Sequence, residues 1–271
     1  MKSIAVYNLK GGVGKTTTVV NLAYLASQKQ QNTILWDWDS QAAATWYLSG
    51  ANTQNANTSS DNTSNNTNTT LNNTNTPIKN KSIKLLSKGI PVGELEVRTP
   101  YPRLSVIPAD LSLRKMDAEL QLHNNPRKLI EGLIKPLSEE VSFLFHDCPP
   151  SLSPSIEHLL STTDLVLVPI IPSAMSIRAA LQVIEFFNAK KHQPKKIVGF
   201  FNQVDGRRKI HQQTIANAQA MPIEMLKTCI PYDSAAEQMG EQQAPLMAYA
   251  NRGRAYSAYN NLWREIQKLL K

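Results

Sequence analysis

Seven short apolar runs constrain the fold of this chain more than any other feature of its sequence. They are rich in β-branched or aromatic residues and lie at 3–8, 33–38, 104–109, 141–147, 164–170, 196–202 and 227–231. Most are continuously apolar, which is the pattern of strands covered on both faces of a parallel sheet. Helical stretches lie between them, for example at 15–30 and 175–191. The alternation predicts an α/β fold with a doubly wound, mostly parallel sheet and helices on both faces.

One segment departs from this alternation. Residues 51–76 are almost wholly Asn, Thr and Ser. Such a composition buries too little apolar surface to offset the entropy cost of ordering the chain. We therefore expect one domain over 1–271 with a disordered, functionally inert insertion at 51–76, although Asn/Thr-rich tracts can also self-associate.

The composition limits the compartment and the classes of partner. The net charge of +8 favours polyanionic partners, either nucleic acid or an anionic membrane surface. The two cysteines, Cys148 and Cys229, form no CxxC pair, which argues against a disulfide framework or a thiolate zinc site. The sequence shows no leader peptide and no apolar run near the ~18 residues of a membrane span. These features predict a cytoplasmic protein.

The stretch NLKGGVGKTTT, residues 8–18, follows a predicted strand and precedes a predicted helix, which is the context of a phosphate-binding P-loop. Glycines at 11, 12 and 14 let backbone N–H groups close around phosphate oxygens, and the helix adds the positive end of its dipole. Lys15 is then expected to contact the β- and γ-phosphates of a nucleotide. The hydroxyl of Thr16 is expected to contact Mg²⁺.

The loop departs from the usual pattern at its start. Leu9 stands where the first glycine is normally found, and Lys10 follows it. A second ammonium so near Lys15 is costly unless concentrated negative charge is shared between them. From the rim of the loop, Lys10 can point toward a nucleotide held by a facing copy of the chain, as arginine fingers do in trans. The alternative is a solvent-exposed lysine that merely flanks the loop.

Three carboxylates follow two of the predicted strands. Asp37 and Asp39 lie two residues apart at the end of the 33–38 run, so they share one face at the carboxyl end of the sheet. Asp147 ends the 141–147 run. A strand-end acid such as Asp37 can also cap a helix. The neighbours of Asp147, His146 and Cys148, point to the opposite face and are predicted to be packed residues and not metal ligands.

Together these motifs resemble the ParA/MinD family of ATPases with a deviant Walker A motif, over essentially the whole chain except 51–76. The segment 37–41 is similar to the family's Asp-x-Asp-Pro-Gln box, with Ser40 in the proline position. The resemblance implies that Asp39 orients the attacking water, and that Asp37 and Asp147 with Thr16 lie around Mg²⁺. The implied nucleotide-binding residues are Lys10, Gly11, Gly12, Val13, Gly14, Lys15, Thr16 and Thr17, with Asn202 (FFNQVD) and Pro231 (IPYD) beside adenine.

The resemblance also implies a function. Family members form an ATP-sandwich homodimer in which the early lysine, here Lys10, reaches the partner's phosphates. The expected activity is weak ATP hydrolysis stimulated by an adaptor protein, coupled to nonspecific DNA binding on the nucleoid. The segments 104–113 and 244–266 are similar to small ParA-type proteins, including those that distribute carboxysomes. The cargo could be a plasmid, a chromosome region or a protein organelle.

Basic residues gather at 190–196, 206–212 and 251–259. Such groups suggest a surface that follows a phosphate backbone without reading its sequence. The foremost candidates for DNA contact are Arg252 and Arg254, followed by Arg207, Arg208 and Lys209.

Three alternative classes of protein share parts of this pattern. A MinD-like ATPase would insert a C-terminal amphipathic helix into lipid, and apolar residues do recur at helical spacing from Tyr256 to Leu270. We expect this helix to continue from the segment 244–259 without a flexible joint, which favours core packing over membrane binding. An iron–sulfur ATPase would need paired cysteines at a dimer axis. A biosynthetic ligase could use the same loop.

Overall fold

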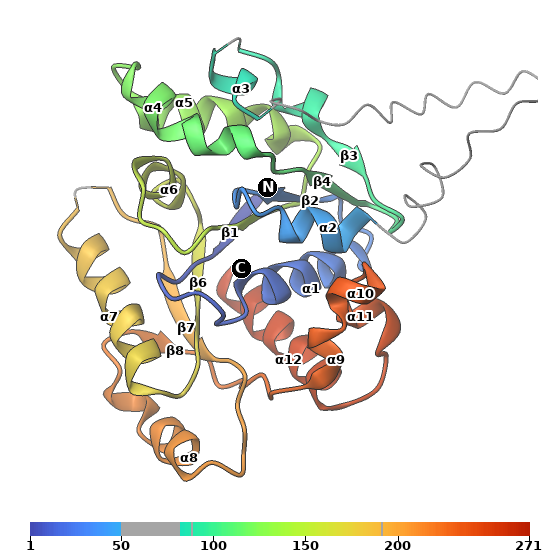
Figure 1. Cartoon of the computed structure of the whole chain (residues 1–271), viewed down its shortest axis with the longest axis vertical. Helices are drawn as coiled ribbons and strands as arrows, with labels where there is room; N and C mark the ends of the chain where they lie inside the picture. The colour runs from blue at the N-terminus through green and yellow to red at the C-terminus, as the bar shows by residue number, and fades with distance from the viewer. Residues whose placement is uncertain (50–81, 88, 191) are drawn as a thin grey trace, which may run out of the picture.

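The computed structural model describes residues 1–49, 82–87, 89–190 and 192–271, so the predicted insertion at 51–76 lies outside them. Within the described residues one eight-stranded sheet has the order β3-β4-β2-β5-β1-β6-β7-β8 (Figure 1). The strands are β1 Lys2–Val6, β2 Thr33–Asp37, β3 Val97–Arg98, β4 Leu104–Ile107, β5 Phe143–Asp147, β6 Leu165–Ile170, β7 Ile197–Phe201 and β8 Glu224–Met225.

All neighbouring strands are parallel except β3 and β4, so the predicted doubly wound, mostly parallel sheet is confirmed. Every residue of β2, β5 and β6 is buried, as their continuous apolar pattern predicts. The register places Asp147 of β5 beside Val6 of β1 on one side and Asp37 of β2 on the other. The ends of three strands therefore meet at one point of the carboxyl edge.

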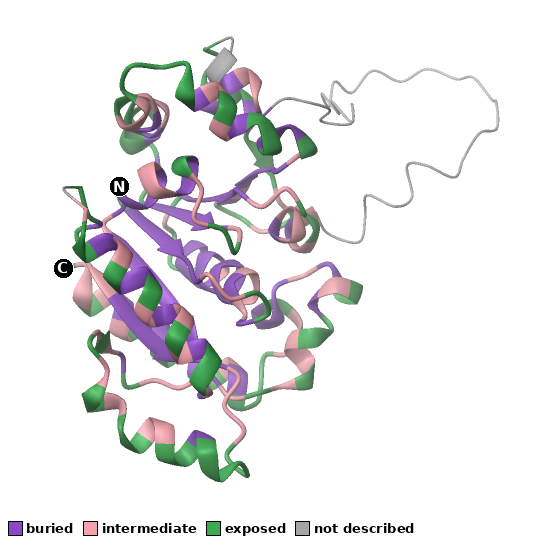
Figure 2. Cartoon of the chain, turned by 60° about the vertical axis from the view of Figure 1, so that its left-hand side comes forward, coloured by how far each residue is buried: buried purple, intermediate pink, exposed green. Residues whose placement is uncertain are grey.

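Helices cover both faces of the sheet (Figure 1). The long helices α1 and α12 pack on one face, while α4 to α7 cover the other, and Figure 2 shows the buried strands between them. The helices are α1 Lys15–Ser27, α2 Ala43–Ser49, α3 Lys84–Ser87, α4 Met116–Gln121, α5 Pro126–Ile134, α6 Pro154–Leu160, α7 Ala174–Asn188, α8 Lys209–Ala216, α9 Ser234–Glu237, α10 Met239–Gln242, α11 Leu246–Tyr249 and α12 Arg254–Leu269. The 3-10 segments in the described part of the chain are η2 Val92–Leu95, η3 Leu111–Lys115, η4 Lys135–Glu139 and η5 Ala218–Ala220.

The prediction of a strand at 227–231 is wrong. The last strand, β8, lies earlier in the chain, and residues 227–230 form a loop. The physical reason is a carboxylate on α12: Glu265 accepts hydrogen bonds from the backbone N–H of Lys227 at 2.9 Å and from the Thr228 hydroxyl at 2.8 Å. Pro231 pairs with the chain only through an isolated bridge to Val204.

The C-terminal helix is not continuous with the segment before it, which corrects the sequence expectation. The short helix α11 ends at Tyr249, and α12 starts after Gly253, whose φ of 126° is one that only glycine adopts readily. The expected core packing holds nevertheless. Tyr259, Trp263 and Ile266 are fully or almost fully buried, and the Trp263 ring packs edge-on against Phe143 with ring centroids 5.1 Å apart.

No helix within the described ranges is long and apolar enough to cross a bilayer.

Replacing Trp263 by Ala should lower the free energy of unfolding by about 3–5 kcal/mol, because it opens a cavity between α12 and the sheet. Urea titration followed by far-UV circular dichroism measures this loss. The control Lys268→Ala removes an exposed side chain of the same helix and should change the free energy by less than about 0.5 kcal/mol. Similar small losses for both variants would contradict the docking of α12 on the core.

Candidate active site

The loop between β1 and α1 forms an open backbone cradle. Gly12 and Gly14 have φ values of 72° and 85°, in the left-handed region that glycine tolerates. At Gly14 space is also limiting, because a Cβ would lie 2.3 Å from Nδ2 of Asn202. No side chain caps the first turn of α1, so its N–H groups stay available to an anion.

The two lysines of the loop have different surroundings. Lys15 is 7% exposed, and its Nζ donates to the carbonyl of Lys10 at 3.2 Å. Burial lowers the pKa of Lys15, and the negative charge of Asp147 opposes that shift. The backbone N–H of Lys10 donates to Oδ1 of Asn8, whose Nδ2 donates to the Pro169 carbonyl at 2.8 Å. Lys10 is thereby anchored by its main chain, and its ammonium forms no ion pair with any acid of the described residues.

Asp147 is a buried carboxylate that lacks a donor. Its side chain is fully buried, and neither oxygen has a hydrogen-bond partner of normal geometry among the described residues. Burial raises the pKa of Asp147 and the neighbouring Asp37 raises it further, while the nearby Thr16 hydroxyl lowers it. A hard divalent cation held by this carboxylate and the Thr16 hydroxyl would relieve both the charge and the missing partner. The residues present therefore fit Mg²⁺.

Asp37 lies beside Asp147 but has its partners already. Its Oδ2 accepts hydrogen bonds from the backbone N–H and the hydroxyl of Thr45, at 2.9 and 2.7 Å, and its Oδ1 accepts from the backbone N–H of Asp39. Burial raises the pKa of Asp37 to about 6 against these hydrogen bonds. Of the two roles that the sequence leaves open, the described contacts are those of an acid that caps the first turn of α2.

Asp39 is half-buried at the start of the loop after β2. Its Oδ1 accepts from the backbone N–H of Gln41 at 2.9 Å, and its carbonyl accepts from the N–H of Ala42. Ala42 has a φ of 55°, which is uncommon for a residue with a Cβ. The loop thus folds tightly back and directs Asp39 toward the same edge as Lys15 and Asp147, both of which Asp39 influences electrostatically.

His146 and Cys148 are packed residues, as the alternation predicts. Both are buried in the core on the face away from Asp147. His146 bonds to Trp38 and Ser3, and no group of three or more His, Cys, Asp or Glu side chains in the described part of the chain could hold a metal ion.

A cavity of ≈ 210 Å³ adjoins the loop and contains both residues predicted beside adenine, Asn202 and Pro231. Nδ2 of Asn202 donates to the Val13 carbonyl at 2.7 Å, so this amide group holds the phosphate loop and leaves its oxygen for a ligand. Sequence reasoning missed Gln203, which donates to the Gly12 carbonyl at 2.9 Å. It also missed the aromatic rings of Tyr47 and Tyr232 in the cavity wall. Tyr232 adjoins Pro231, whereas nothing local marks Tyr47.

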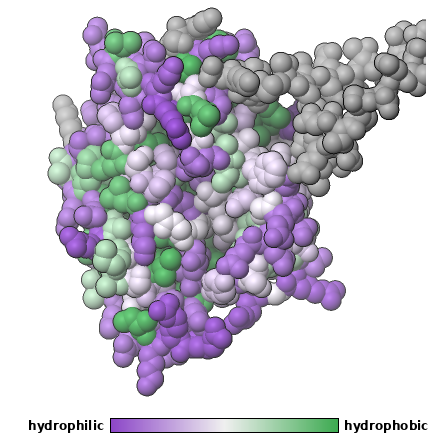
Figure 3. All heavy atoms as spheres, viewed as in Figure 1, coloured by the Kyte–Doolittle hydropathy of each residue, from purple (hydrophilic) through white to green (hydrophobic). Residues whose placement is uncertain are grey.

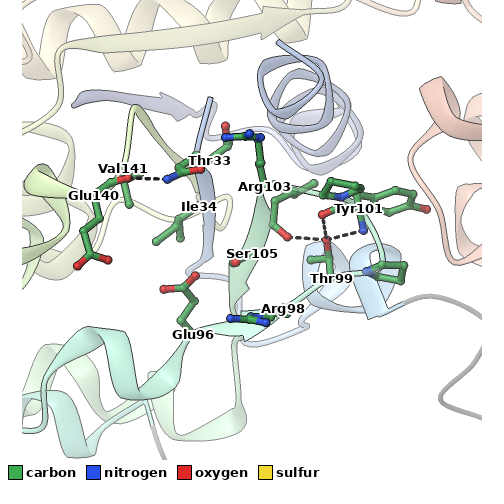
Figure 4. A pocket seen from close by; sticks show the side chains of 14 residues that line it. Thr33, Ile34, Glu96, Arg98, Thr99, Tyr101, Arg103, Ser105, Glu140 and Val141 are labelled. Carbon is green, nitrogen blue, oxygen red and sulfur yellow. Dashed lines mark hydrogen bonds between the residues drawn. The ribbon is translucent and has the colours of Figure 1, made fainter. Parts of the chain in front are cut away.

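Figure 4 shows a second pocket, of ≈ 480 Å³, at the amino ends of β2 and β4. Glu96, Arg98, Arg103 and Glu140 stand around it, and it contains none of the predicted site residues. Parallel α/β sheets bind ligands at the carboxyl ends of their strands, so the loop-side cavity is the candidate active site.

The five predicted DNA-contacting residues are all exposed. Arg207 and Arg254, from two groups far apart in sequence, line one cavity of ≈ 370 Å³ together with Tyr232. This cavity adjoins α8, at the lower end of the molecule in Figure 1, where the surface in Figure 3 is largely hydrophilic. Arg207 is also paired with Asp205 through two side-chain hydrogen bonds of 3.0 Å.

In the basic group at 190–196, the lysines that the structure describes are paired with acids. Lys190 pairs with Glu157 at 2.9 Å, Lys195 with Asp164 at 2.5 Å, and Lys196 with Glu224 at 2.9 Å. The structure thus separates the paired lysines at 190–196 from Arg252 and Arg254, which form no ion pair among the described residues.

Comparison with known proteins gives related sequences along the whole chain. A family model described as an AAA domain (AAA_31) matches residues 1–199. The chromosome partitioning protein ParA of Myxococcus xanthus is 25% identical over 270 residues, covering 98% of this chain and 87% of that protein. The sporulation initiation inhibitor protein Soj of Bacillus subtilis is 24% identical over 270 residues and covers 98% of both chains.

Solved structures share the fold. Cobyrinic acid a,c-diamide synthase of Mycobacterium smegmatis, with bound ATP analog and magnesium, has a TM-score of 0.76 at 19% identity, over 100% of this chain and 96% of its own. A complex of a Cyanothece McdA variant with ATP has a TM-score of 0.74 at 17% identity, covering 98% of this chain and 96% of its own. The Pyrococcus furiosus cell division ATPase MinD has a TM-score of 0.72 at 22% identity, covering 99% of each chain.

The resemblance that the sequence motifs carry is thereby confirmed. Since the family model matches more than half of the chain, the chain belongs to the AAA_31 family of AAA domains, and it is an ATPase of the ParA/MinD type.

Proposed function

We propose that this chain is a ParA-type ATPase whose ATP-bound homodimer binds DNA nonspecifically and positions a cargo. The observation that carries the proposal is Lys10, a cation anchored by its main chain at the rim of the phosphate loop without an acid partner among the described residues. Such a group is free to bind negative charge that comes from elsewhere. The triphosphate of a facing subunit supplies it, so that ATP selects the dimeric state.

Within one subunit, the backbone of residues 11–17 and the Lys15 ammonium bind the phosphates. Thr16 and Asp147 hold Mg²⁺, which when bound neutralises charge on the phosphate oxygens. Asp37 shapes the loop after β2 through Thr45, and Asp39 orients the attacking water. Asn202 and Pro231, with Tyr47 and Tyr232, enclose the adenine.

The DNA surface in this proposal lies around the Tyr232 cavity. Arg252 and Arg254 flank the start of α12, whose first turn has no side-chain cap, so its N–H groups add to the positive potential. Arg207, Arg208 and Lys209 extend the surface along the start of α8. These contacts would be to phosphates and would therefore be independent of sequence.

An adaptor protein that stimulates weak hydrolysis and recruits a cargo completes the proposed cycle on the nucleoid. The similarity to ParA and Soj over 98% of this chain supports this part. A MinD-like membrane role is less well supported, because the apolar face of α12 is used by the core. The fold is also shared with a biosynthetic enzyme, cobyrinic acid a,c-diamide synthase, and ATP-dependent DNA binding would separate the two functions.

The substitution Lys10→Ala should weaken ATP-dependent dimerisation by about 100-fold or more, because it leaves the partner's triphosphate without its cation. Nucleotide affinity of the monomer should change by less than about threefold, since residues 11–17 remain. Analytical ultracentrifugation with a nonhydrolysable ATP analogue measures the dimer. Lys2→Ala, at the other end of β1, is the matched control. Dimers of normal stability in the Lys10 variant would refute the contact in trans.

The substitution Asp39→Ala should lower ATP turnover by about 100-fold or more, because water loses its orienting carboxylate. The ATP-bound dimer should persist, and steady-state phosphate release together with sedimentation measures both properties. Glu185→Ala removes an exposed carboxylate of α7 and should leave turnover unchanged. Normal turnover of the Asp39 variant would remove this residue from the mechanism.

Replacing both Arg252 and Arg254 by Ala should weaken binding to unrelated DNA duplexes equally. It should also reduce the slope of log K against log salt by about 2, because each arginine neutralises one phosphate. Fluorescence anisotropy at several salt concentrations with ATP measures this slope. The matched control is Lys195→Ala, whose charge is already paired with Asp164. An unchanged slope in the double variant would place the DNA surface elsewhere.

A further inference from the structure

An aromatic cluster lies directly behind the strand-end acids Asp37 and Asp147. Trp36 and His146 are register partners on β2 and β5, one residue before the pair Asp37 and Asp147. Because side chains alternate along a strand, the two acids face α1, while Trp36 and His146 face the opposite core. Trp38 joins this cluster, and its ring stacks on Trp36 with centroids 4.6 Å apart.

A hydrogen-bond chain runs through the cluster. Nε1 of Trp38 donates to Nδ1 of His146 at 3.1 Å, and Nε2 of His146 lies 3.0 Å from Oγ of Ser3. An indole N–H can only donate, so Nδ1 carries no proton and Nε2 carries it. His146 is therefore neutral in this arrangement.

Trp38 is the residue between Asp37 and Asp39, so its position affects the backbone of the loop that follows β2. Its backbone N–H donates to the Asp147 carbonyl at 2.9 Å, and the next N–H, of Asp39, donates to Asp37. Trp38 is only 4% exposed.

The indole of Trp38 adjoins an open space. It borders a small cavity of ≈ 130 Å³ that Ser40 and Ser151 also line. Hydroxyl groups could accept the indole N–H there if His146 did not.

We propose that His146 is a positioning residue for ATP hydrolysis: its hydrogen bond to Trp38 Nε1 fixes the backbone that carries Asp39. The inference rests on the proposed function, in which Asp39 orients the attacking water. His146 is fully buried on the face of β5 opposite Asp147, so it would act through Trp38. His146 forms its pair with Trp38 and is not part of the phosphate loop.

The test compares two replacements of His146 in the full-length protein. His146→Leu removes the acceptor, and kcat should fall by about tenfold, because small displacements of a positioned group are costly in rate. The Kd for a fluorescent ATP analogue should stay within about twofold, since the phosphate loop is untouched. His146→Asn places a carbonyl oxygen near the position of Nδ1 and should restore most of kcat.

A second variant approaches the same hydrogen bond from its other end. Trp38→Phe keeps an aromatic ring, deletes the donor and should lower kcat to a similar extent. Combining it with His146→Leu should cause little further loss, because both changes break one interaction. The matched control is Trp263→Phe, the same chemical change at a buried indole whose N–H has no partner in the described residues, and kcat should not change.

The proposal is overturned if kcat per folded molecule is normal in both His146→Leu and Trp38→Phe. It is also overturned if kcat and nucleotide affinity decline together, as a purely structural role would predict. Should His146→Leu fail to fold, Trp38→Phe decides. Failure of the proposed function is distinguishable, because Asp39→Ala would then turn over normally. A slow Asp39→Ala with a normal His146→Leu defeats this inference alone.

Discussion

Asp37 and Asp147 are register partners on β2 and β5, and both are fully buried. Two carboxylates so placed have lost their hydration, so burial raises the pKa of each. The negative charge of Asp37 raises the pKa of Asp147 further. Lys15 is the buried cation whose charge acts on Asp147, and its own pKa is lowered by burial. Hydrogen bonds from Thr45 and Asp39 satisfy the carboxylate of Asp37. The carboxylate of Asp147 has no hydrogen-bond donor of normal geometry among the described residues, and a metal ion bound with its nucleotide would supply the missing partner.

The parts of this arrangement that the sequence predicts are those with local causes. Continuous apolar runs predict buried parallel strands, and a glycine-rich loop between strand and helix predicts the cradle. The strand expected at 227–231 does not form where Glu265, far along the chain on α12, accepts from the backbone N–H of Lys227 and the hydroxyl of Thr228. Gly253 breaks the C-terminal helix in a stretch whose apolar spacing alone predicts continuity. The carboxylate of Glu265 lies outside the local pattern, whereas Gly253 is a local helix-breaking signal that the apolar spacing obscures.

The same limit applies to partners of predicted residues. Alternation along β5 correctly predicts that His146 is packed, but its partners Ser3 and Trp38 are 143 and 108 residues away in sequence. Lysines at 190–196 and arginines at 251–259 look alike in composition, yet Asp164 and Glu224 neutralise Lys195 and Lys196 only in the folded chain. Composition predicts a positive surface, and the fold decides which charges are free to act.

The proposed coupling between nucleotide and DNA has a short physical path. Tyr232 lines both the cavity next to the phosphate loop and the cavity between Arg207 and Arg254. Its hydroxyl donates to Glu237 at 2.6 Å, a residue that also faces the nucleotide-side cavity. A base that enters this cavity must therefore contact the wall that separates it from the arginines. Through such a shared side chain, nucleotide bound in one cavity can change the affinity of the other cavity for DNA. This link requires no rearrangement of the sheet.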